Sequence, residues 1–546
     1  MVHANATAVQ LAGDVPIEQC VNAVDPRAER NDPETLLATF VDAGSLFTLL
    51  SSEDHQVLYG RRGTGKTHVL QFLAETVRTG GDVAVYVDMR TVGSSGGIYG
   101  DPSISITERG TRLLADTLSH VYNVLQSEVL ATSYKANADF SAALANLDRL
   151  GDSLTDVRVT GDLEHEVNDA QGSKKADGTS LEVSVHPSPG LKAGLTESQE
   201  STRQTSRRLL ARGPVRQRVH FGAISGSIHA VVESLPGRLW VLLDEWSDVP
   251  LDLQPLLADL LRRCLLPVSR VTVKIGAIEQ RSNFMQPDGV GGYVGLELGP
   301  DISADVDLDD FMVFGNDATR AKDFFKELMF RHVSLEMKDH PDAPSSADDF
   351  VRKAFTQHNA FEEFVRAAEG VPRDAINIAM VAAQNANEDA ISVPTLRSAA
   401  RRWYLRDKEK AVEANGDAMA LLHWVIDEVI AGRKARAFLL RQGEFSNDYL
   451  INALYDARVL HVIKRGVSAH DQPGVRFNVY ALDYGCYVEL ITTNNEPAGL
   501  LPGEDDADLP VFVEVPPDDY RSIRRAILDL QAFRTEQGEG ERNSSL

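Results

Sequence analysis

Runs of consecutive apolar residues recur in the amino-terminal part of the chain and predict buried strands. They are VLY at 57–59, VAVYV at 83–87, LWVLL at 239–243 and VTVKIGAI at 271–278. Strands without polar alternation are typical of a parallel sheet covered on both faces. Between them lie segments with apolar residues at helical spacing, such as 106–132 and 135–151, and Asp32-Pro33-Glu34 has the composition of a helix start. The pattern predicts an α/β fold.

The carboxyl-terminal half has a different pattern. Residues 318–411 keep helical spacing almost throughout, with breaks at 340–345 and at Gly370-Val371-Pro372. Beyond them, 417–431 and 446–458 are predicted helices, the second with a good start at Ser446-Asn447-Asp448. Two short strands follow, VLHVIKRG and VRFNVYALD, separated by a turn. Helices followed by such a hairpin resemble a winged helix.

Polar segments separate these blocks. Residues 152–200 are rich in Gly, Ser and Pro, with LEVSV as a short strand, and they are interpreted as an insertion. From Glu496 an acidic linker precedes a predicted strand, VFVEV, and one helix. The predicted organisation is an N-terminal segment 1–31, a core 32–317 with the insertion 152–220, a helical domain 318–411, a winged-helix-like domain 412–495 and a tail 496–546.

Composition narrows the class of protein. A chain of 546 residues is expected to form two to four domains. No apolar run approaches the roughly 20 residues that a membrane span needs, and the first residues lack a signal-peptide pattern. Three distant cysteines, Cys20, Cys264 and Cys486, support neither a disulfide framework nor a zinc site. A cytoplasmic protein without membrane contact is expected.

A phosphate-binding motif follows the first predicted strand. Residues 60–67, GRRGTGKT, fit G-x-x-x-x-G-K-[ST], and a predicted strand and helix flank them as the motif requires. Backbone N–H groups of such a loop surround phosphate oxygens; Lys66 would reach the β- and γ-phosphates and Thr67 would hold Mg²⁺. ATP and Mg²⁺ are the expected cofactors. The predicted binding residues are Gly60, Arg61, Arg62, Gly63, Thr64, Gly65, Lys66, Thr67 and His68.

Two acids end the strand at 239–243. Asp244 is predicted to enter the Mg²⁺ shell, and Glu245 to polarise a water in line with the γ-phosphate. A strand that merely ends in solvated acids is the alternative. Because the acids follow a complete phosphate-binding loop, hydrolysis is expected as well as binding.

These motifs together resemble a known family. GRRGTGKT, LWVLLDEWS, a further strand and EGVPRDA in a helical segment look like an AAA+ or STAND-type P-loop ATPase, most similar to the Orc/Cdc6-like branch. The resemblance implies an α/β P-loop NTPase core with a parallel sheet, followed by a helical lid and a winged-helix-like domain. It also implies that Arg373, in Gly370-Val371-Pro372-Arg373, senses the γ-phosphate from the lid. At the sensor-1 position, often Asn, Ser or Thr in the family, this chain departs and reads Glu279-Gln280-Arg281-Ser282. There Gln280 could orient the attacking water, and Arg281 could approach phosphate or a neighbour.

One departure from the family concerns its arginine finger. No Lys or Arg occurs from Ser282 to Thr319, where a ring-forming AAA+ protein usually carries that residue. The resemblance then favours a STAND-like or Orc-like switch, with slow hydrolysis by the isolated chain, because such an arginine contributes a factor of about 10³ or more.

Two basic regions are candidate contacts for a partner, but they do not decide its chemical class. Six arginines and no acid lie between 201 and 218, and the candidate contacts are Arg203, Arg207, Arg208 and Arg212. They fit a nucleic-acid backbone, an acidic partner such as another copy of the chain, or a solvated helix face. In the winged-helix region the second helix is poor for DNA and suits a protein–protein contact better, whereas the basic hairpin keeps DNA binding possible.

The sequence thus supports three hypotheses. The first is an ATP-hydrolysing switch that acts on a protein or nucleoprotein partner; by family association such ATPases occur in bacterial defence systems. The second is an Orc/Cdc6-like initiator or loader whose DNA binding ATP controls. The third is a scaffold in which nucleotide is structural. The net charge of −25 argues only against indiscriminate coating of nucleic acid.

Overall fold

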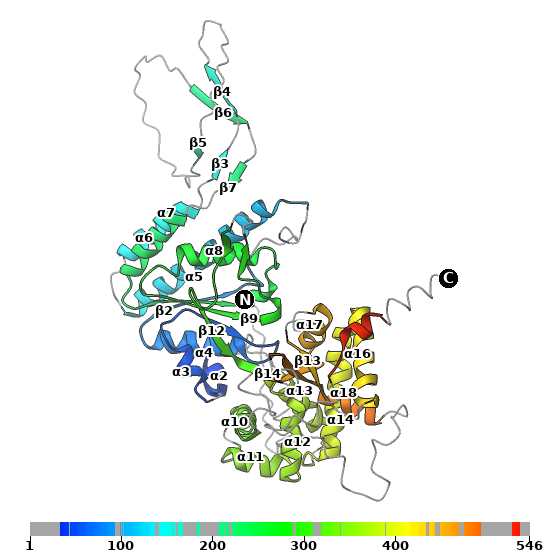
Figure 1. The fold of residues 1–546 in the computed structure, drawn as a ribbon. Coiled ribbons are helices and arrows are strands. Elements are labelled where there is room, and N and C mark those ends of the chain that lie inside the picture. The colour runs from blue at the N-terminus through cyan, green and yellow to red at the C-terminus, as the bar shows by residue number, and fades with distance from the viewer. Residues whose placement is uncertain are drawn as a thin grey trace, which may run out of the picture.

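A computed structural model describes most of the chain (Figure 1). The described residues are 33–42, 44–92, 99, 101, 103–136, 141–154, the strand segments 157–159, 162–167, 183–185, 207–212 and 215–217, then 221–287, 291–309, 318–338, 340–387, 389–432, 436–442, 448–468, 474–492 and 527–535. Within them no helix is long and apolar enough to cross a membrane.

The core contains a five-stranded sheet with the order β12-β1-β9-β8-β2, and every pair in it is parallel. Its strands are β1 (Gln56–Tyr59), β2 (Val83–Asp88), β8 (Leu239–Asp244), β9 (Val271–Ala277) and β12 (Ser303–Asp307). The predicted parallel sheet is confirmed. The sequence did not predict β12, because this edge strand, SADVD, alternates small and acidic residues.

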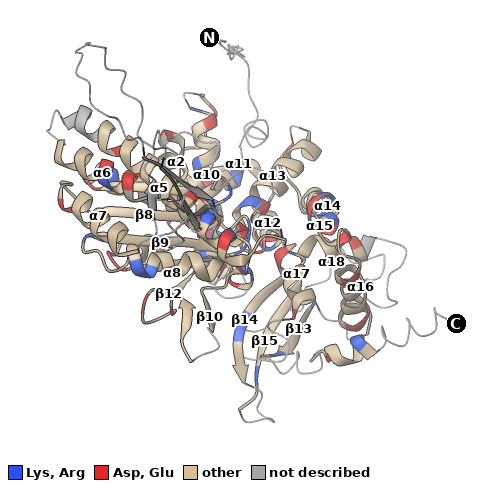
Figure 2. Cartoon of the chain, turned by 90° about the horizontal axis from the view of Figure 1, so that it is seen from above, with Lys and Arg blue, Asp and Glu red and all other residues tan. Residues whose placement is uncertain are grey.

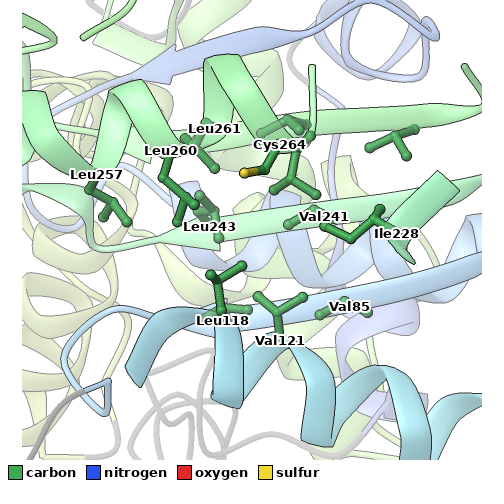
Figure 3. Close-up of a cluster of buried hydrophobic side chains, with 14 of the residues drawn as sticks. Val85, Leu118, Val121, Ile228, Val241, Leu243, Leu257, Leu260, Leu261 and Cys264 are labelled. Carbon is green, nitrogen blue, oxygen red and sulfur yellow. The ribbon is translucent and has the colours of Figure 1, made fainter. Parts of the chain in front are cut away.

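Helices cover both faces of this sheet. Alternate residues of β8 face opposite sides: Val241 and Leu243 pack in one apolar cluster, and Trp240 and Leu242 in another. The first cluster includes α5 (Ile106–Ala136), α6 (Ser141–Leu154), α7 (Phe221–Glu233) and α8 (Gln254–Cys264). Figure 3 shows α8 and α5 approaching the strands from opposite sides of this cluster. The second cluster includes α4 (Lys66–Thr79).

Short 3-10 turns and a hairpin complete the core. The turn η3 (Trp246–Asp248) follows β8 and η4 (Glu279–Arg281) follows β9, so both lie at the carboxyl edge of the sheet. The antiparallel pair β10 (Met285–Pro287) and β11 (Tyr293–Gly295) comes next. Trp246 is fully buried and stacks on Phe284.

The insertion is strand-rich. β3 (Val157–Val159), β5 (Val183–Val185) and β7 (Val215–Gln217) form one small sheet, and β4 (Asp162–Val167) pairs with β6 (Arg207–Arg212). The strand predicted in LEVSV is confirmed at Val183–Val185. The helix interpretation of the arginine cluster is wrong for 207–212, because these residues pair with β4 as an antiparallel strand.

The lid is helical, as predicted. Its elements are α10 (Ala318–Glu336), α11 (Ala347–Ala354), α12 (His358–Ala368), α13 (Pro372–Ala386), α14 (Val393–Trp403), the π-helical turn η5 (Tyr404–Lys408) and α15 (Glu409–Glu413). Glu369 and Gly370 adopt left-handed backbone conformations, which ends α12 before α13 begins at Pro372. One apolar cluster joins these helices to α2 (Pro33–Thr39), α3 (Leu46–Leu50) and α4, so lid and core pack as one body.

The last module is a winged-helix-like domain. It contains α16 (Gly416–Val425) with η6 (Ile426–Gly432), β13 (Ala437–Arg441), α17 (Tyr449–Asp456), β14 (Leu460–Ser468), β15 (Arg476–Leu482) and α18 (Tyr484–Thr492). The hairpin β14–β15 is confirmed and gains β13 as a third strand. Asp448 caps α17 by accepting from Leu450 N at 2.9 Å. Residues 527–535 also pack on this module through Leu528, Leu530 and Phe533, so its core extends past the predicted boundary at 495.

Candidate nucleotide-binding site

The loop between β1 and α4 has the backbone of a phosphate cradle. Gly63 and Gly65 have φ of 87° and 98°, which side-chain-bearing residues rarely adopt, and α4 begins at Lys66. A loop of this kind at the positive end of a helix suits the binding of an anion. Lys66 Nζ donates to Gly60 O at 2.7 Å and to Arg61 O at 3.0 Å. Burial lowers the pKa of Lys66, and Asp244 opposes that shift.

Asp244 lies beside this loop, at the end of β8. Its Oδ2 accepts from Thr67 Oγ1 at 2.6 Å and from the Tyr86 hydroxyl at 2.8 Å. A hydroxyl and a carboxylate this close are the protein ligands that Mg²⁺ takes alongside a nucleotide. Asp244 Oδ1 faces β9 at Gly276, where an added Cβ would lie 2.8 Å from it. Gly276 therefore leaves room for the carboxylate.

Glu245 turns away from the strand direction. Its φ is 54°, a left-handed conformation uncommon for a side-chain-bearing residue, and its carboxylate is 20% exposed. Burial raises the pKa of Glu245, and the neighbouring Asp244 raises it further. Arg90, just after β2, approaches the Glu245 carboxylate at 3.7 Å. A carboxylate with a raised pKa is a stronger base, which suits the abstraction of a proton from water.

The lid contributes Arg373. Its backbone N donates to Gly63 O at 3.2 Å, and an added Cβ on Gly63 would lie 2.9 Å from Arg373 Cβ. The side-chain Nε is buried, and it has no hydrogen-bond partner among the residues that the structure describes. An unsatisfied buried guanidinium nitrogen costs free energy unless an anion completes it. The lid arginine and the phosphate-binding loop, more than 300 residues apart in the sequence, are thus brought together.

These groups fit a nucleoside triphosphate with Mg²⁺. The cradle supplies backbone donors, Arg373 supplies an incomplete donor, and Thr67 with Asp244 supplies two oxygen ligands. Within the described part of the chain no group of three or more His, Cys, Asp or Glu side chains could hold a metal ion. The donor set therefore suits a cation that arrives with phosphates, not one held by protein alone.

Four predicted residues have other side-chain roles. The Arg61 side chain is 1% exposed and binds Asp309, and Arg62 is 47% exposed and pairs with Asp248 at 3.2 Å. His68 Nε2 lies 3.0 Å from Leu36 O. Gln280 donates to Glu279 within its own turn at 3.5 Å. Contact of Arg61, Arg62, His68 and Gln280 with a nucleotide stays a prediction.

The candidate partner contacts lie elsewhere. Arg203 falls outside the described residues, and Arg207, Arg208 and Arg212 lie on β6, in a sheet separate from the central one (Figure 1). Their role as partner contacts stays a prediction.

Sequence reasoning missed three residues that shape this site: Tyr86, Arg90 and Gly276. Tyr86 could have been found from its strand, since VAVYVD is parallel to LWVLLD and pairs Asp88 with Asp244. Arg90 and Gly276 carry no local signal. Their importance depends on which strands are neighbours, and the strand order is set by the whole fold.

Comparison with known proteins relates the amino-terminal part of the core to one family. Residues 24–80, which span α2 through α4 with the phosphate-binding loop, match the family model described as ORC-CDC6-like. This confirms the resemblance to Orc/Cdc6-like AAA+ ATPases that the motifs indicated. No curated protein matches the chain.

Two solved structures are similar over most of their length. One is Drosophila ORC bound to DNA, with 11% identity, a TM-score of 0.32, and coverage of 90% of this chain and 95% of that chain. The other is the Aeropyrum pernix ORC1 protein in complex with DNA, with 14% identity, a TM-score of 0.29, and coverage of 86% and 95%. At these values neither similarity identifies a ligand for this chain.

Proposed function

We propose that this protein is an ATP-binding and ATP-hydrolysing switch of the AAA+ or STAND type that acts on a protein or nucleoprotein partner in the cytoplasm. The observation that carries the proposal is the placement of Arg373 against Gly63, with its buried Nε unpartnered among the described residues. One guanidinium that contacts both lid and phosphate makes the lid position depend on the nucleotide.

The residues then have defined roles. Lys66, which now donates to two loop carbonyls, would donate to β- and γ-phosphate oxygens. Thr67 and Asp244 would hold Mg²⁺, and the ion would supply positive charge to the phosphates. Glu245 accepts a proton from the attacking water, with its raised pKa as the driving force. Arg90, 3.7 Å from the Glu245 carboxylate, would keep that carboxylate in position. A role in bacterial defence is part of this proposal by family association alone.

The test is γ-phosphate release from ATP by the full chain, with and without duplex DNA. Lys66→Ala is expected to weaken nucleotide binding and abolish turnover, since it removes the only lysine of the loop. Glu245→Gln is expected to bind ATP normally and to lose about 100-fold in turnover. Lys322→Ala, which removes a surface ion pair with Glu362 on the lid, is the control and should change neither. Unchanged turnover in Glu245→Gln would overturn the proposed hydrolysis at this site. The nucleotide would then have a structural role only.

A DNA-dependent loader is the second candidate function, and the winged-helix hairpin favours it. Lys464 and Arg476 lie exposed on β14 and β15, and Figure 2 marks positive positions on this hairpin in blue. Arg465 of the same hairpin is instead paired with Glu279 at 2.6 Å and Asp307 at 3.3 Å. If duplex DNA raises ATP turnover several-fold, and the double variant Lys464→Gln, Arg476→Gln loses this stimulation, this candidate becomes the first.

A further inference from the structure

The side chain of Arg61 points away from the phosphate cradle although its backbone forms part of it. Nε donates to Asp309 Oδ1 at 2.8 Å, and the backbone N of Arg61 donates to Asp309 Oδ2 at 2.9 Å. One terminal nitrogen donates to Glu369 O, at the end of α12, at 3.4 Å. The guanidinium also lies over the Tyr455 ring of α17, 5.0 Å from its centre. Core, lid and winged-helix module therefore all contact this one side chain.

The remaining terminal nitrogen of Arg61 binds the winged-helix module. Nη1 lies 2.7 Å from Nδ1 of His461, on β14. Arginine only donates, so Nδ1 must be the acceptor, and the proton of the imidazole sits on Nε2. Nε2 then donates to Asp483 Oδ2 at 3.1 Å. Burial lowers the pKa of His461 to about 3, so the ring keeps this neutral form at physiological pH.

Asp483 continues the chain of contacts to the lid. It accepts from Lys408 Nζ at 2.5 Å, and Lys408 also pairs with Asp374 at 2.9 Å. Asp374 is the residue next to Arg373 at the start of α13. We call these six residues the junction network: Arg61, Asp309, His461, Asp483, Lys408 and Asp374. Each is at least nine-tenths buried.

Arg61 is also a structural part of the cradle. Its carbonyl accepts from Thr64 Oγ1 at 2.8 Å and from Lys66 Nζ at 3.0 Å. A shift of the Arg61 main chain would therefore also shift Lys66, the lysine expected to bind phosphate. A buried network in which each side-chain nitrogen has a partner has few alternative geometries, so it holds the loop in one shape.

We infer that His461 is a positioning residue for the nucleotide site: by fixing the Arg61 side chain it makes docking of the winged-helix module and the affinity of the loop for triphosphate interdependent. This inference rests on the proposed nucleotide binding and adds that the winged-helix module supplies part of the site. Reciprocity follows from thermodynamics, because a contact that favours nucleotide must be favoured by nucleotide to the same degree.

The experiment compares the affinity of a fluorescent ATP analogue for four proteins: wild type, His461→Leu, His461→Asn and Tyr484→Phe. His461→Leu removes the acceptor for Arg61, and His461→Asn restores an acceptor oxygen near the Nδ1 position. Tyr484→Phe is the matched control, since it deletes a buried hydroxyl that binds Glu363 in the lid. Hydrogen exchange of β14 and β15, with and without the analogue, measures the reciprocal effect.

The expected result is a Kd raised about tenfold in His461→Leu, within about threefold of wild type in His461→Asn, and unchanged in Tyr484→Phe. Nucleotide should slow exchange on β14 in wild type and not in His461→Leu. A folded His461→Leu protein with wild-type affinity overturns the inference, and so does an equal loss in Tyr484→Phe, which would indicate general destabilisation.

Tyr455→Phe covers the case in which His461→Leu does not fold. It removes only the hydroxyl that donates to Asp309 Oδ2 at 3.1 Å and leaves the ring beside Arg61. A rise of about two- to threefold in Kd supports the inference and an unchanged Kd overturns it. Wild-type protein that binds no nucleotide would instead overturn the proposed function, which separates the two failures.

Discussion

The nucleotide site and the junction network both concentrate charged residues, but they satisfy them differently. In the nucleotide site Arg373 Nε is buried with no partner among the described residues, and Glu245 is 20% exposed with a distant ion pair. In the junction network Lys408, with 1% exposure, has two carboxylates, and Asp483 accepts from both His461 and Lys408. In these two regions, a buried donor without a partner lies where a nucleotide would bind, and buried charges with partners lie where modules meet.

The largest expected effect comes from breaking the complete network. Lys408→Met leaves Asp374 and Asp483 as buried carboxylates without their shared cation. Loss of one partner of a buried ion pair costs about 3–5 kcal/mol, so the free energy of unfolding should fall by that amount. Chemical denaturation measures it. Lys322→Met, at the partly exposed pair with Glu362, is the control and should cost less than about 1 kcal/mol. Equal losses of unfolding free energy in Lys408→Met and Lys322→Met would contradict the difference between the buried network and an exposed ion pair.

Crowding the incomplete site should impair turnover more than stability. In Gly276→Ala the added methyl would lie 2.8 Å from Asp244 Oδ1 and displace the carboxylate. We expect turnover of ATP to fall about 10- to 100-fold, because displacements near 1 Å of a catalytic group have effects of this size. Gly222→Ala on α7, where the methyl meets no atom within 4 Å, is the control. Steady-state kinetics of the two variants decide the question; wild-type turnover in Gly276→Ala would show that Asp244 can shift without loss.

Acid should weaken the protein through buried histidines. Burial lowers the pKa of His461 to about 3 and that of His332 to about 4, against 6.5 for an unperturbed histidine. Between those values the unfolded chain binds protons that the folded chain does not, so the free energy of unfolding falls as the pH drops from 6.5 towards 4. The slope is about 1.4 kcal/mol per pH unit for each histidine. Denaturation across this range measures it, and His461→Asn should reduce the slope. An identical slope would refute the assignment.

Buried carboxylates with a lowered pKa affect stability at a lower pH than the histidines do. The pKa of Asp374 and that of Asp309 are lowered, chiefly by Arg458 and Arg61 respectively against the opposing effect of burial. Their stabilisation is present above a pH of about 4 and is lost as the pH falls further. The histidine slope can therefore be measured separately, at a pH above this window.

The smallest effect is expected at the exposed contacts between core and winged-helix module. Arg281, 43% exposed, pairs with Asp456 of α17 at 2.7 Å. Because water screens such pairs, Arg281→Gln should lower the free energy of unfolding by less than about 1 kcal/mol. Denaturation again provides the measurement. A loss above about 2 kcal/mol would show that these exposed pairs, and not the buried network, hold the modules together.

Much of the fold was predictable because its signals are local. The four apolar runs became β1, β2, β8 and β9, and GRRGTGKT became the loop after β1 and the first two residues of α4. Gly370-Val371-Pro372 became the break before α13, since Pro starts a helix readily. Edge strand β12 and the third strand β13 were missed. RRWYLRDKEK at 401–410 is rich in charge, yet the structure buries Lys408 within it.

By itself the sequence determined the α/β class, the phosphate-binding loop, the acidic strand end and the lid arginine, because periodicity and short motifs act between neighbours in the chain. Only the tertiary structure decided which charges are paired. Arg61 meets Asp309 across 248 residues and His461 across 400. The cost of burying a charge depends on the partners that surround it in space, and chain order does not give those partners. That is why the proposed nucleotide site could be predicted from the sequence and the junction network could not.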